Sequence, residues 1–393
     1  MILKNYFYDL VTDKKNGYLA CGFGYRKPNH GFLACVIKFF LLVLSWIYSF
    51  IIRVLIFFYS RKPYQAECKV ISVGNITWGG AGKTPLVESI ARHLKEKKYR
   101  IAILSRGYKR KAAAIKGRRL AGYEAMGDEP YMLSKNLSGI PIIVDANRMR
   151  ALVKAHKECK IDIAILDDGF QQWGIKKDLE VVVVDATEAF GNRQMIPRGI
   201  LREPLSSLRR ADIFVLTKTD IGNSNILRTK DFLNSVNPKA EIFESVYKPI
   251  GFCPIRDYSA IGKEKGVSNG VCGITESGRL LNTDALKGKT VTVISGIANP
   301  DSFEHSLVSL GINIGLSFRF PDHFVYRKQV MNDIVKKTQE INISTIITTE
   351  KDLVRMQPET LNTKIKIFAL KIELKITTNE KKFFDRISDV LTN

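Results

Sequence analysis

The chain has 393 residues, 45% hydrophobic and 25% charged, so it is long enough for two domains with hydrophobic cores and its composition excludes general disorder. Its formal net charge of +22 indicates an anionic partner, which is a nucleic acid, an acidic membrane surface or a phosphorylated substrate. The six cysteines are scattered, with no CxxC pair and no histidines at zinc-ligand spacing. This pattern favours free thiols in a reducing compartment.

The N-terminal region changes abruptly in composition. Residues 1–33 show no periodicity and are interpreted as an extension, whereas residues 34–62 hold a long apolar run with Lys38 and Arg53 near its ends. A bilayer span needs about 20 largely apolar residues, a length reached here only if one of these charges is tolerated. We therefore predict a membrane anchor helix that lies in, or dips into, the inner leaflet.

The apolar run has two alternatives to an anchor helix. A cleaved signal peptide is disfavoured, because the apolar run begins late and no small-residue cleavage site follows it. A buried core helix is disfavoured because nearly all its helical faces are apolar, which a domain of this size rarely needs.

Residues 69–97 predict a buried strand, a glycine-rich turn and an amphipathic helix with Pro85 in its first turn. Glycines in such a turn let backbone amides surround phosphate oxygens, Lys83 can reach the β and γ phosphates, and the Thr84 hydroxyl can ligate Mg²⁺. One position departs from the GxxxxGK[ST] form, because Thr77 replaces the first glycine. The predicted nucleotide-binding phosphate loop consists of Thr77, Trp78, Gly79, Gly80, Ala81, Gly82, Lys83 and Thr84.

A second strand is expected at residues 100–105, followed by a basic segment at 106–119. A run of charge is usually a solvated face. This run follows a strand of a nucleotide-binding fold, the edge where ligands bind, so a phosphate-bearing partner or lipid headgroups are a second interpretation. Residues 127–137 predict a helix with Pro130 as its first helical residue, where Asp128 and Glu129 would cap the helix and complement its dipole.

Residues 161–172 read IDIAILDDGFQQ, an apolar strand that ends in paired carboxylates. This is the form of a Walker B element, in which Asp167 and Asp168 hold Mg²⁺ or its waters against the bound phosphates. Further strands are expected at 179–186 and 211–220, and the second of these ends in TKTD, which fits the guanine-reading [NT]KxD pattern.

Beyond Asp220 the alternation of strand and helix loosens, and residues 252–288 read as a loop-rich insertion before strand and helix signals return. These patterns predict an α/β fold of the P-loop NTPase type, a mostly parallel sheet flanked by helices, with a second smaller α/β domain and an N-terminal membrane helix. The expected boundaries are an extension at 1–33, an anchor helix at 34–62, a kinase core at 63–222, a linker at 223–289 and a C-terminal domain at 290–393.

The chain resembles the tetraacyldisaccharide 4'-kinases, the lipid A 4'-kinases of Gram-negative bacteria. The resemblance extends from about Ser45 to the C-terminal region and rests on VGNITWGGAGKTP, SRGYKRK, GDEPYML, DDGFQQ, PRGILREP, LTKTD, FPDHF and TTEKD, in the family's order. Residues 1–33 are an extension without a match, and 252–288 is longer than usual. The resemblance also accounts for Thr77, because the family's loop has threonine there.

The resemblance implies transfer of the ATP γ-phosphoryl group, with Mg²⁺, to the 4'-hydroxyl of an acylated glucosamine disaccharide 1-phosphate, giving lipid IVA. It implies Asp128 as the catalytic base and His323 as its dyad partner, with closure of the two predicted domains on the substrate. Contacts to the substrate or on the metal side are assigned to Arg106, Tyr108, Arg202 and Glu203. Because the nucleotide is cytosolic, the chain after Arg61 is expected on the cytoplasmic face of the inner membrane, beside anionic lipids.

The sequence leaves two other functions open to comparison. A membrane-associated GTPase switch or metallochaperone is suggested by residues 217–220, but no Cys or His cluster could carry a metal. A partitioning ATPase would need a lysine where the loop has Trp78. No nucleic-acid-binding motif underlies the positive charge, so we expect neither a nucleic acid nor an evident protein partner.

Overall fold

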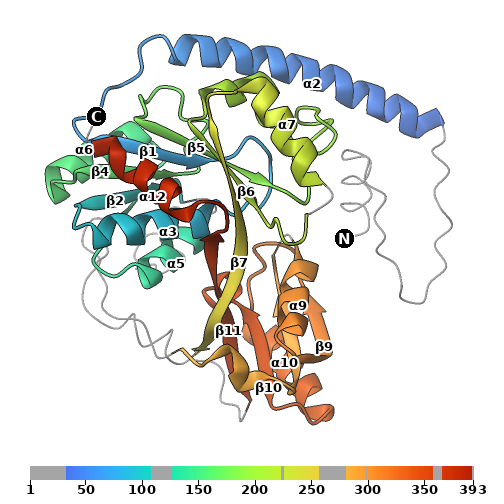
Figure 1. Ribbon diagram of the computed structural model, residues 1–393. Coiled ribbons are helices and arrows are strands. Elements are labelled where there is room, and N and C mark those ends of the chain that lie inside the picture. Colours follow the sequence, from blue (N-terminus) through green and yellow to red (C-terminus); the bar gives the residue numbers. More distant parts are fainter. Residues whose placement is uncertain are drawn as a thin grey trace, which may run out of the picture. The chain divides into compact units, whose positions relative to one another are not determined.

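The computed structural model describes residues 32–107, 126–222, 225–255, 280–297, 299–356 and 365–391. The chain divides into two compact units, each built from several stretches of sequence (Figure 1). Unit 1 comprises Met1–Gln65, Ser72–Gly82 and Gly169–Ser245, and unit 2 comprises Ala66–Ile71, Lys83–Asp168 and Val246–Asn393. Strand β1 (Lys69–Gly74) and strand β7 (Glu241–Pro254) each cross from one unit to the other along the chain.

Unit 1 contains parallel strands, and one of them, β6, has a helix before it and a helix after it in the sequence. Strand β5 (Leu179–Asp185) pairs in parallel with β6 (Ile213–Thr217), and β6 pairs in parallel with the start of β7. The short helix η1 (Leu205–Arg210) precedes β6, and α7 (Ile226–Val236) follows it. The continuous apolar run of β5 reflects burial on both faces of the sheet, as expected for a central parallel strand.

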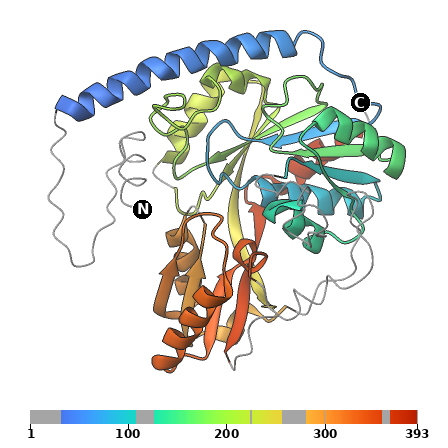
Figure 2. The same cartoon turned by 180° about the vertical axis from the view of Figure 1, so that it is seen from behind.

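Helix α2 (Phe32–Tyr59) lies along the outside of the rest of unit 1 (Figures 1 and 2). It packs there by one strip of side chains. Leu41, Ser45 and Ile52 are buried, and Tyr48 and Ile56 pack against the core that α7 also covers. The remaining faces expose large apolar side chains, namely Phe39, Phe40, Leu44, Trp46, Ile47, Phe50, Ile51, Leu55, Phe57, Phe58 and Tyr59. The helix expected at 34–62 is confirmed as a helix. Its length and composition would allow it to cross a membrane, but its insertion stays a prediction.

Unit 2 carries two groups of parallel strands. In the first, β2 (Ile101–Ser105) pairs with both β3 (Ile142–Val144) and β4 (Ile163–Asp167), accompanied by α3 (Lys83–Glu96), α5 (Asp128–Asn136) and α6 (Arg148–Cys159). In the second, β10 (Thr345–Thr349) pairs with β8 (Thr290–Ser295) and β11 (Lys366–Ile376), and β8 pairs with β9 (Asn313–Arg319). The other elements of this unit are η3 (Thr283–Leu286), α9 (Pro300–Ser309), α10 (Lys328–Glu340), α11 (Glu350–Leu353), α12 (Glu380–Ser388) and η5 (Asp389–Leu391).

The predicted mostly parallel α/β fold is thus confirmed, with two local corrections. Helix α5 begins at Asp128 rather than at Pro130. Its N-cap is Gly127, which has a φ of 94°, and no side chain caps the first turn. The region beyond Asp220, where strand and helix alternation was expected to loosen, holds α7 and the long strand β7.

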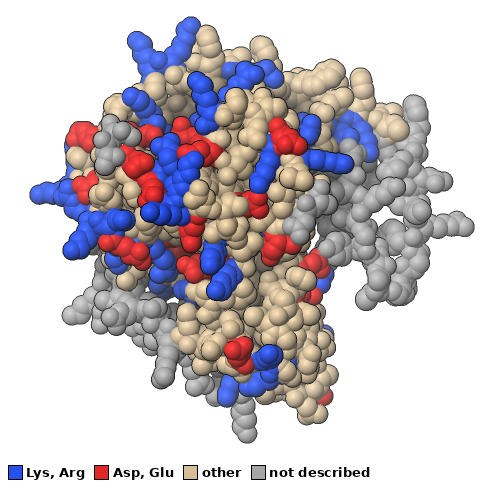
Figure 3. Space-filling view, in the orientation of Figure 1, with Lys and Arg blue, Asp and Glu red and all other residues tan. Residues whose placement is uncertain are grey.

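Several expectations lie wholly or partly outside the described residues. These are the extension at 1–33, most of the basic segment at 106–119, and the central part of the 252–288 insertion. On the face shown in Figure 3, acidic and basic side chains are interspersed among the described residues.

Candidate active site

The phosphate loop follows β1 and has the backbone that its glycines predict. Gly79 and Gly82 have φ angles of 128° and 88°, which residues with a side chain rarely adopt. The loop is held from outside, because the Thr217 hydroxyl donates to the Ala81 carbonyl at 2.9 Å and the Trp78 amide donates to the Ile200 carbonyl at 2.7 Å. The Trp78 side chain is 69% exposed.

Helix α3 begins at the last two residues of the phosphate loop. The Lys83 ammonium lies 3.3 Å from Asp168, the second carboxylate of the Walker B pair, and Thr84 is buried beside it in the sequence. Pro85 lies in the first turn of this helix, as predicted. The structure therefore brings the predicted phosphate-binding lysine and one predicted metal ligand into contact.

The Walker B carboxylates follow β4. Asp167 is 3% exposed, and Asp168 has a φ of 56° that turns the chain sharply after the strand. Burial, together with the nearby charges of Glu129 and Asp168, raises the pKa of Asp167 to about 7, although Lys83 and Arg148 partly oppose this. A buried carboxylate beside a second, partly exposed one is an environment that a divalent cation with oxygen ligands would stabilise.

Arg148 supports this pair and was not predicted. It is 2% exposed, and its guanidinium donates to the backbone carbonyls of Asp167 at 3.1 Å and Asp145 at 2.7 Å. Within the described ranges, no group of three or more His, Cys, Asp or Glu side chains is arranged to hold a metal ion. Asp167, Asp168 and the Thr84 hydroxyl stay the Mg²⁺ ligands predicted from the sequence.

Asp128, at the start of α5, meets His323 from the loop after β9. The two residues lie 195 positions apart, and His323 Nδ1 is 2.9 Å from Asp128 Oδ2. His323 has a φ of 62°, a strained backbone that aims its ring. Both residues belong to unit 2, so the structure brings together the pair that the resemblance assigned as a dyad.

A third residue, Arg355, completes this cluster. Its Nε donates to Asp128 Oδ2 at 2.6 Å, and its side chain is 1% exposed. Burial by itself raises the pKa of Asp128, but the hydrogen bond from His323 and the charge and hydrogen bond of Arg355 outweigh it, so the pKa lies below its ordinary value. Arg355 lies three residues after the TTEKD segment, and no sequence pattern marked it.

Helix α5 is tied to α3, the helix that carries Lys83. The Asn136 amide donates to Glu88 at 3.1 Å, and Arg92 and Lys95 donate to the backbone carbonyls of Asn136 at 2.9 Å and Ser138 at 2.6 Å. These contacts fix the helix of the candidate base against the helix of the phosphate-binding lysine.

The four residues assigned to substrate contacts have different surroundings. Arg106 is exposed at the end of β2, and Tyr108 lies outside the described residues. Arg202 is half-buried, with its amide bonded to the Ile76 carbonyl at 2.8 Å and its guanidinium 3.4 Å from Asn75.

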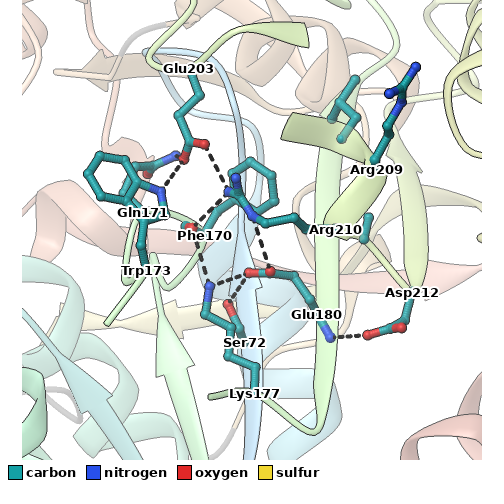
Figure 4. A network of polar contacts seen from close by, with 12 residues as sticks. Ser72, Phe170, Gln171, Trp173, Lys177, Glu180, Glu203, Arg209, Arg210 and Asp212 are labelled. Carbon is teal, nitrogen blue, oxygen red and sulfur yellow. Dashed lines mark hydrogen bonds and ion pairs between the residues drawn. The ribbon is translucent and has the colours of Figure 1, made fainter. Parts of the chain in front are cut away.

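Glu203 has no exposed surface and is the centre of a polar network in unit 1 (Figure 4). Its Oε1 accepts from Gln171 at 3.0 Å and Trp173 at 3.1 Å, and its Oε2 accepts from Arg210 at 2.8 Å. The predicted role of Glu203 in substrate or metal-side contact stays a prediction.

The TKTD segment at the end of β6 is engaged inside the protein. Thr217 holds the phosphate loop, the Lys218 ammonium pairs with Asp185, and Thr219 bonds to the Ser245 carbonyl at 3.3 Å. These contacts give three of the four residues structural tasks that do not depend on guanine.

Comparison with known proteins matches this chain to one family. Residues 37–392 match the model of LpxK, tetraacyldisaccharide-1-P 4'-kinase. The tetraacyldisaccharide 4'-kinase of Halothermothrix orenii is 34% identical over 366 residues, 88% of this chain and 91% of that protein. That of Elusimicrobium minutum is 33% identical over 368 residues, 90% of this chain and 91% of that protein.

Among solved structures, LpxK from Aquifex aeolicus in complex with ATP is similar, with a TM-score of 0.68 and 27% sequence identity. The match covers 90% of this chain and 99% of that one. The family model and the relatives each span most of the sequence and agree on one activity. The chain therefore belongs to the tetraacyldisaccharide-1-P 4'-kinase family.

Proposed function

We propose that the protein transfers the γ-phosphoryl group of ATP to the 4'-hydroxyl of a tetraacylated glucosamine disaccharide 1-phosphate, the step that makes lipid IVA in lipid A biosynthesis. Membership of the kinase family and the similarity to an ATP-bound LpxK support this activity. The observation in this chain that carries the proposal is the contact of Asp128 with His323 at 2.9 Å, in the same unit as Lys83.

The geometry of Asp128 suits a general base. Both of its contacts, from His323 and from Arg355, use Oδ2, and Oδ1 has no hydrogen-bond partner among the described residues. A substrate hydroxyl that donates to Oδ1 can pass its proton there as the oxygen attacks the γ-phosphorus and the bond to the β-phosphate oxygen breaks. Such a base contributes about 10² to 10⁴ in rate, and positioning and charge neutralisation supply the rest.

The phosphate loop and Lys83 would bind the nucleotide phosphates. The backbone amides of residues 79–84 offer donors, and the helix dipole of α3 favours anions at this end. The Thr84 hydroxyl, Asp167 and Asp168 would hold Mg²⁺, which supplies positive charge to the transferring phosphoryl group when bound. The raised pKa of Asp167 fits this assignment, because burial dominates its surroundings and the charges of Lys83 and Arg148 offset that burial only in part.

We place the protein on the cytoplasmic face of the inner membrane, held by α2. Its exposed apolar faces, with Trp46 and Tyr59 among them, suit the boundary between acyl chains and headgroups. The excess of basic residues favours anionic lipids and a substrate that already carries a phosphate.

A transfer assay tests the function. The detergent-solubilised full chain is incubated with labelled ATP, Mg²⁺ and a monophosphorylated acyl disaccharide, beside Asp128→Ala. Label that enters the lipid with the wild type, and falls sharply with the variant, is the expected result. Transfer that survives the substitution removes Asp128 as the base but keeps the kinase. No transfer, with GTP hydrolysed in preference to ATP, overturns the kinase and favours the GTPase alternative.

A further inference from the structure

Arg355 is a fully buried cation that touches the candidate base directly. Its Nε lies 2.6 Å from Asp128 Oδ2, and its Nη1 donates to the Gly296 carbonyl at 3.1 Å and to Asp352 Oδ1 at 3.1 Å. Burying a charge is costly unless it is paired and hydrogen-bonded. A cation kept at 1% exposure in this position is therefore held by a specific arrangement of partners.

That arrangement centres on Asp352, which has no exposed side-chain surface. Its Oδ2 accepts from the Gly296 amide at 3.0 Å and the Thr349 hydroxyl at 2.7 Å, while its Oδ1 accepts from the Tyr326 hydroxyl at 3.0 Å as well as from Arg355. With both oxygens engaged, Asp352 cannot turn without losing several bonds. It therefore fixes the plane and position of the Arg355 guanidinium.

Gly296 is part of the same arrangement. A Cβ on this residue would lie 2.8 Å from the Tyr326 hydroxyl and 2.9 Å from Asp352 Oδ1, closer than real Cβ atoms approach. The residue bonds to Asp352 through its amide and to Arg355 through its carbonyl. The cluster thus closes around a backbone position that only glycine fits without a shift.

We propose that Arg355 is a positioning residue for phosphoryl transfer: it holds the Asp128 carboxylate by Oδ2, so that Oδ1 faces the substrate hydroxyl, and Asp352 and Tyr326 hold Arg355. The inference rests on the proposed function, because it gives Arg355 a role through the base. His323, in the loop after β9, contacts the same oxygen, so two residues from different segments hold the carboxylate.

The charges around Asp128 agree with this role. Arg355 and His323 together outweigh the effect of burial, so the pKa of Asp128 lies below its ordinary value. Other charged groups near it lie on α11 and in the loop after β9. Lys351 of α11 pairs with Glu129, the residue after Asp128, and with Asp322, the residue before His323. The groups that face the cluster are His323, Arg355, Asp352, Tyr326, Asp322, Lys351 and Glu129.

Removal of the cation predicts a change in pH dependence with a definite sign. In Arg355→Met, burial is opposed by His323 alone, so the pKa of Asp128 rises. The acidic limb of the kcat profile then moves to higher pH. A purely structural role for Arg355 would lower activity at every pH without moving this limb.

The experiment is a double-mutant cycle on the full chain with ATP, Mg²⁺ and the acyl disaccharide. We expect Arg355→Met to lower kcat by about 100-fold, Arg355→Lys to recover part of this loss and the wild-type acidic limb, and Arg355→Met to add little in an Asp128→Asn background. Arg319→Met, which removes an exposed arginine paired with Glu304, is the matched control and should leave kcat unchanged.

Each outcome is informative. Losses that multiply fully in the double variant, or an unchanged acidic limb in Arg355→Met, overturn the positioning role and make Arg355 a residue of stability alone. A wild type that transfers no phosphate refutes the proposed function itself, which is a separate result. Thermal melting of each variant, with and without ATP, shows whether a loss of kcat comes from unfolded protein.

Discussion

Two buried carboxylate clusters in this protein use their oxygens differently. In unit 1, Glu203 accepts hydrogen bonds on both oxygens, from Gln171 and Trp173 on Oε1 and from Arg210 on Oε2. Glu180 accepts from Ser72 at 3.2 Å and Lys177 at 2.5 Å on Oε1, and its Oε2 lies 3.8 Å from Arg210. In unit 2, Asp128 places two donors on one oxygen and leaves the other without a partner in the described part of the chain. Glu203 thus has both oxygens occupied, whereas Asp128 has one oxygen without a hydrogen-bond partner among the described residues.

The balance of burial and pairing also differs. Burial raises the pKa of Glu180 and lowers the pKa of Lys177 in spite of their contact, so neither charge is stabilised relative to water. At Asp128 the partners outweigh burial, and the pKa falls. Asp128 therefore stays ionised near neutral pH and keeps one oxygen available to accept a proton.

The largest expected effect comes from Asp128→Asn. The substitution keeps the shape but removes the charge and the basic oxygen, so kcat should fall by about 10² to 10⁴. Because Arg355 keeps Asp352 and Gly296 as partners, the melting temperature should change much less. Initial rates of lipid phosphorylation and thermal melting measure the two effects. A melting temperature that falls sharply together with kcat would make Asp128 a residue of stability, like Glu203, and would remove the contrast between the two clusters.

Glu203→Gln should act mainly on stability. The amide brings donors against the Arg210, Gln171 and Trp173 donors in a site with no exposed surface, so we expect a loss of about 3–5 kcal/mol. Denaturant unfolding measures this loss. Glu158→Gln, at an exposed ion pair, is the control and should stay within about 0.5 kcal/mol. Unchanged stability with lost transfer would instead support the substrate or metal-side contact predicted from the sequence.

Glu350 offers a third buried carboxylate whose pH dependence can be measured. Burial raises its pKa from 4.5 to about 7, although Lys371 opposes this and Glu88 reinforces it. Between those values the folded protein keeps a proton that the unfolded chain has lost, so the contribution of Glu350 to stability declines as pH rises through this window. Relative to Glu350→Gln, the wild type should lose about 3 kcal/mol from pH 4.5 to 7. Parallel stability profiles of the two proteins would contradict this.

The smallest expected effect is at an uncharged buried group. Ser45 of α2 donates to the Met195 carbonyl at 2.6 Å and accepts from the Arg198 amide at 3.0 Å. Ser45→Ala leaves both backbone groups without this partner and should cost about 1–2 kcal/mol. Ser49→Ala, on the same helix and bonded only weakly to Arg53 at 3.4 Å, is the matched control. Identical melting of the two variants would show that the contact contributes nothing.

Local sequence patterns predicted the elements that depend on local physics. Periodicity and composition predicted three such regions: the strand, turn and helix around Lys83, the strand that ends at Asp167, and the apolar run of β5. The long strand β7 did not, because its burial pattern is irregular and Pro249 and Gly251 interrupt it.

Long-range pairing explains the rest of what the sequence left open. Arg355 and Asp128 lie 227 positions apart, and a contact of that span leaves no periodic trace in either segment. The approach of His323 to Asp128 followed from family resemblance rather than from spacing. The dense network around Glu203 likewise depends on residues from separate segments, so a carboxylate that reads as accessible in a loop turned out to be buried.

The contact between α2 and the loop at residues 195–202 sets a height. Ser45 and Tyr48 bond to this loop, and its Ile200 and Arg202 bond to the backbone on either side of Thr77. If α2 rests in the lipid, the depth of that helix fixes how far above the acyl chains the phosphate loop stands. The position of α2 in the lipid would then decide whether the headgroup of a lipid substrate can reach the phosphate loop.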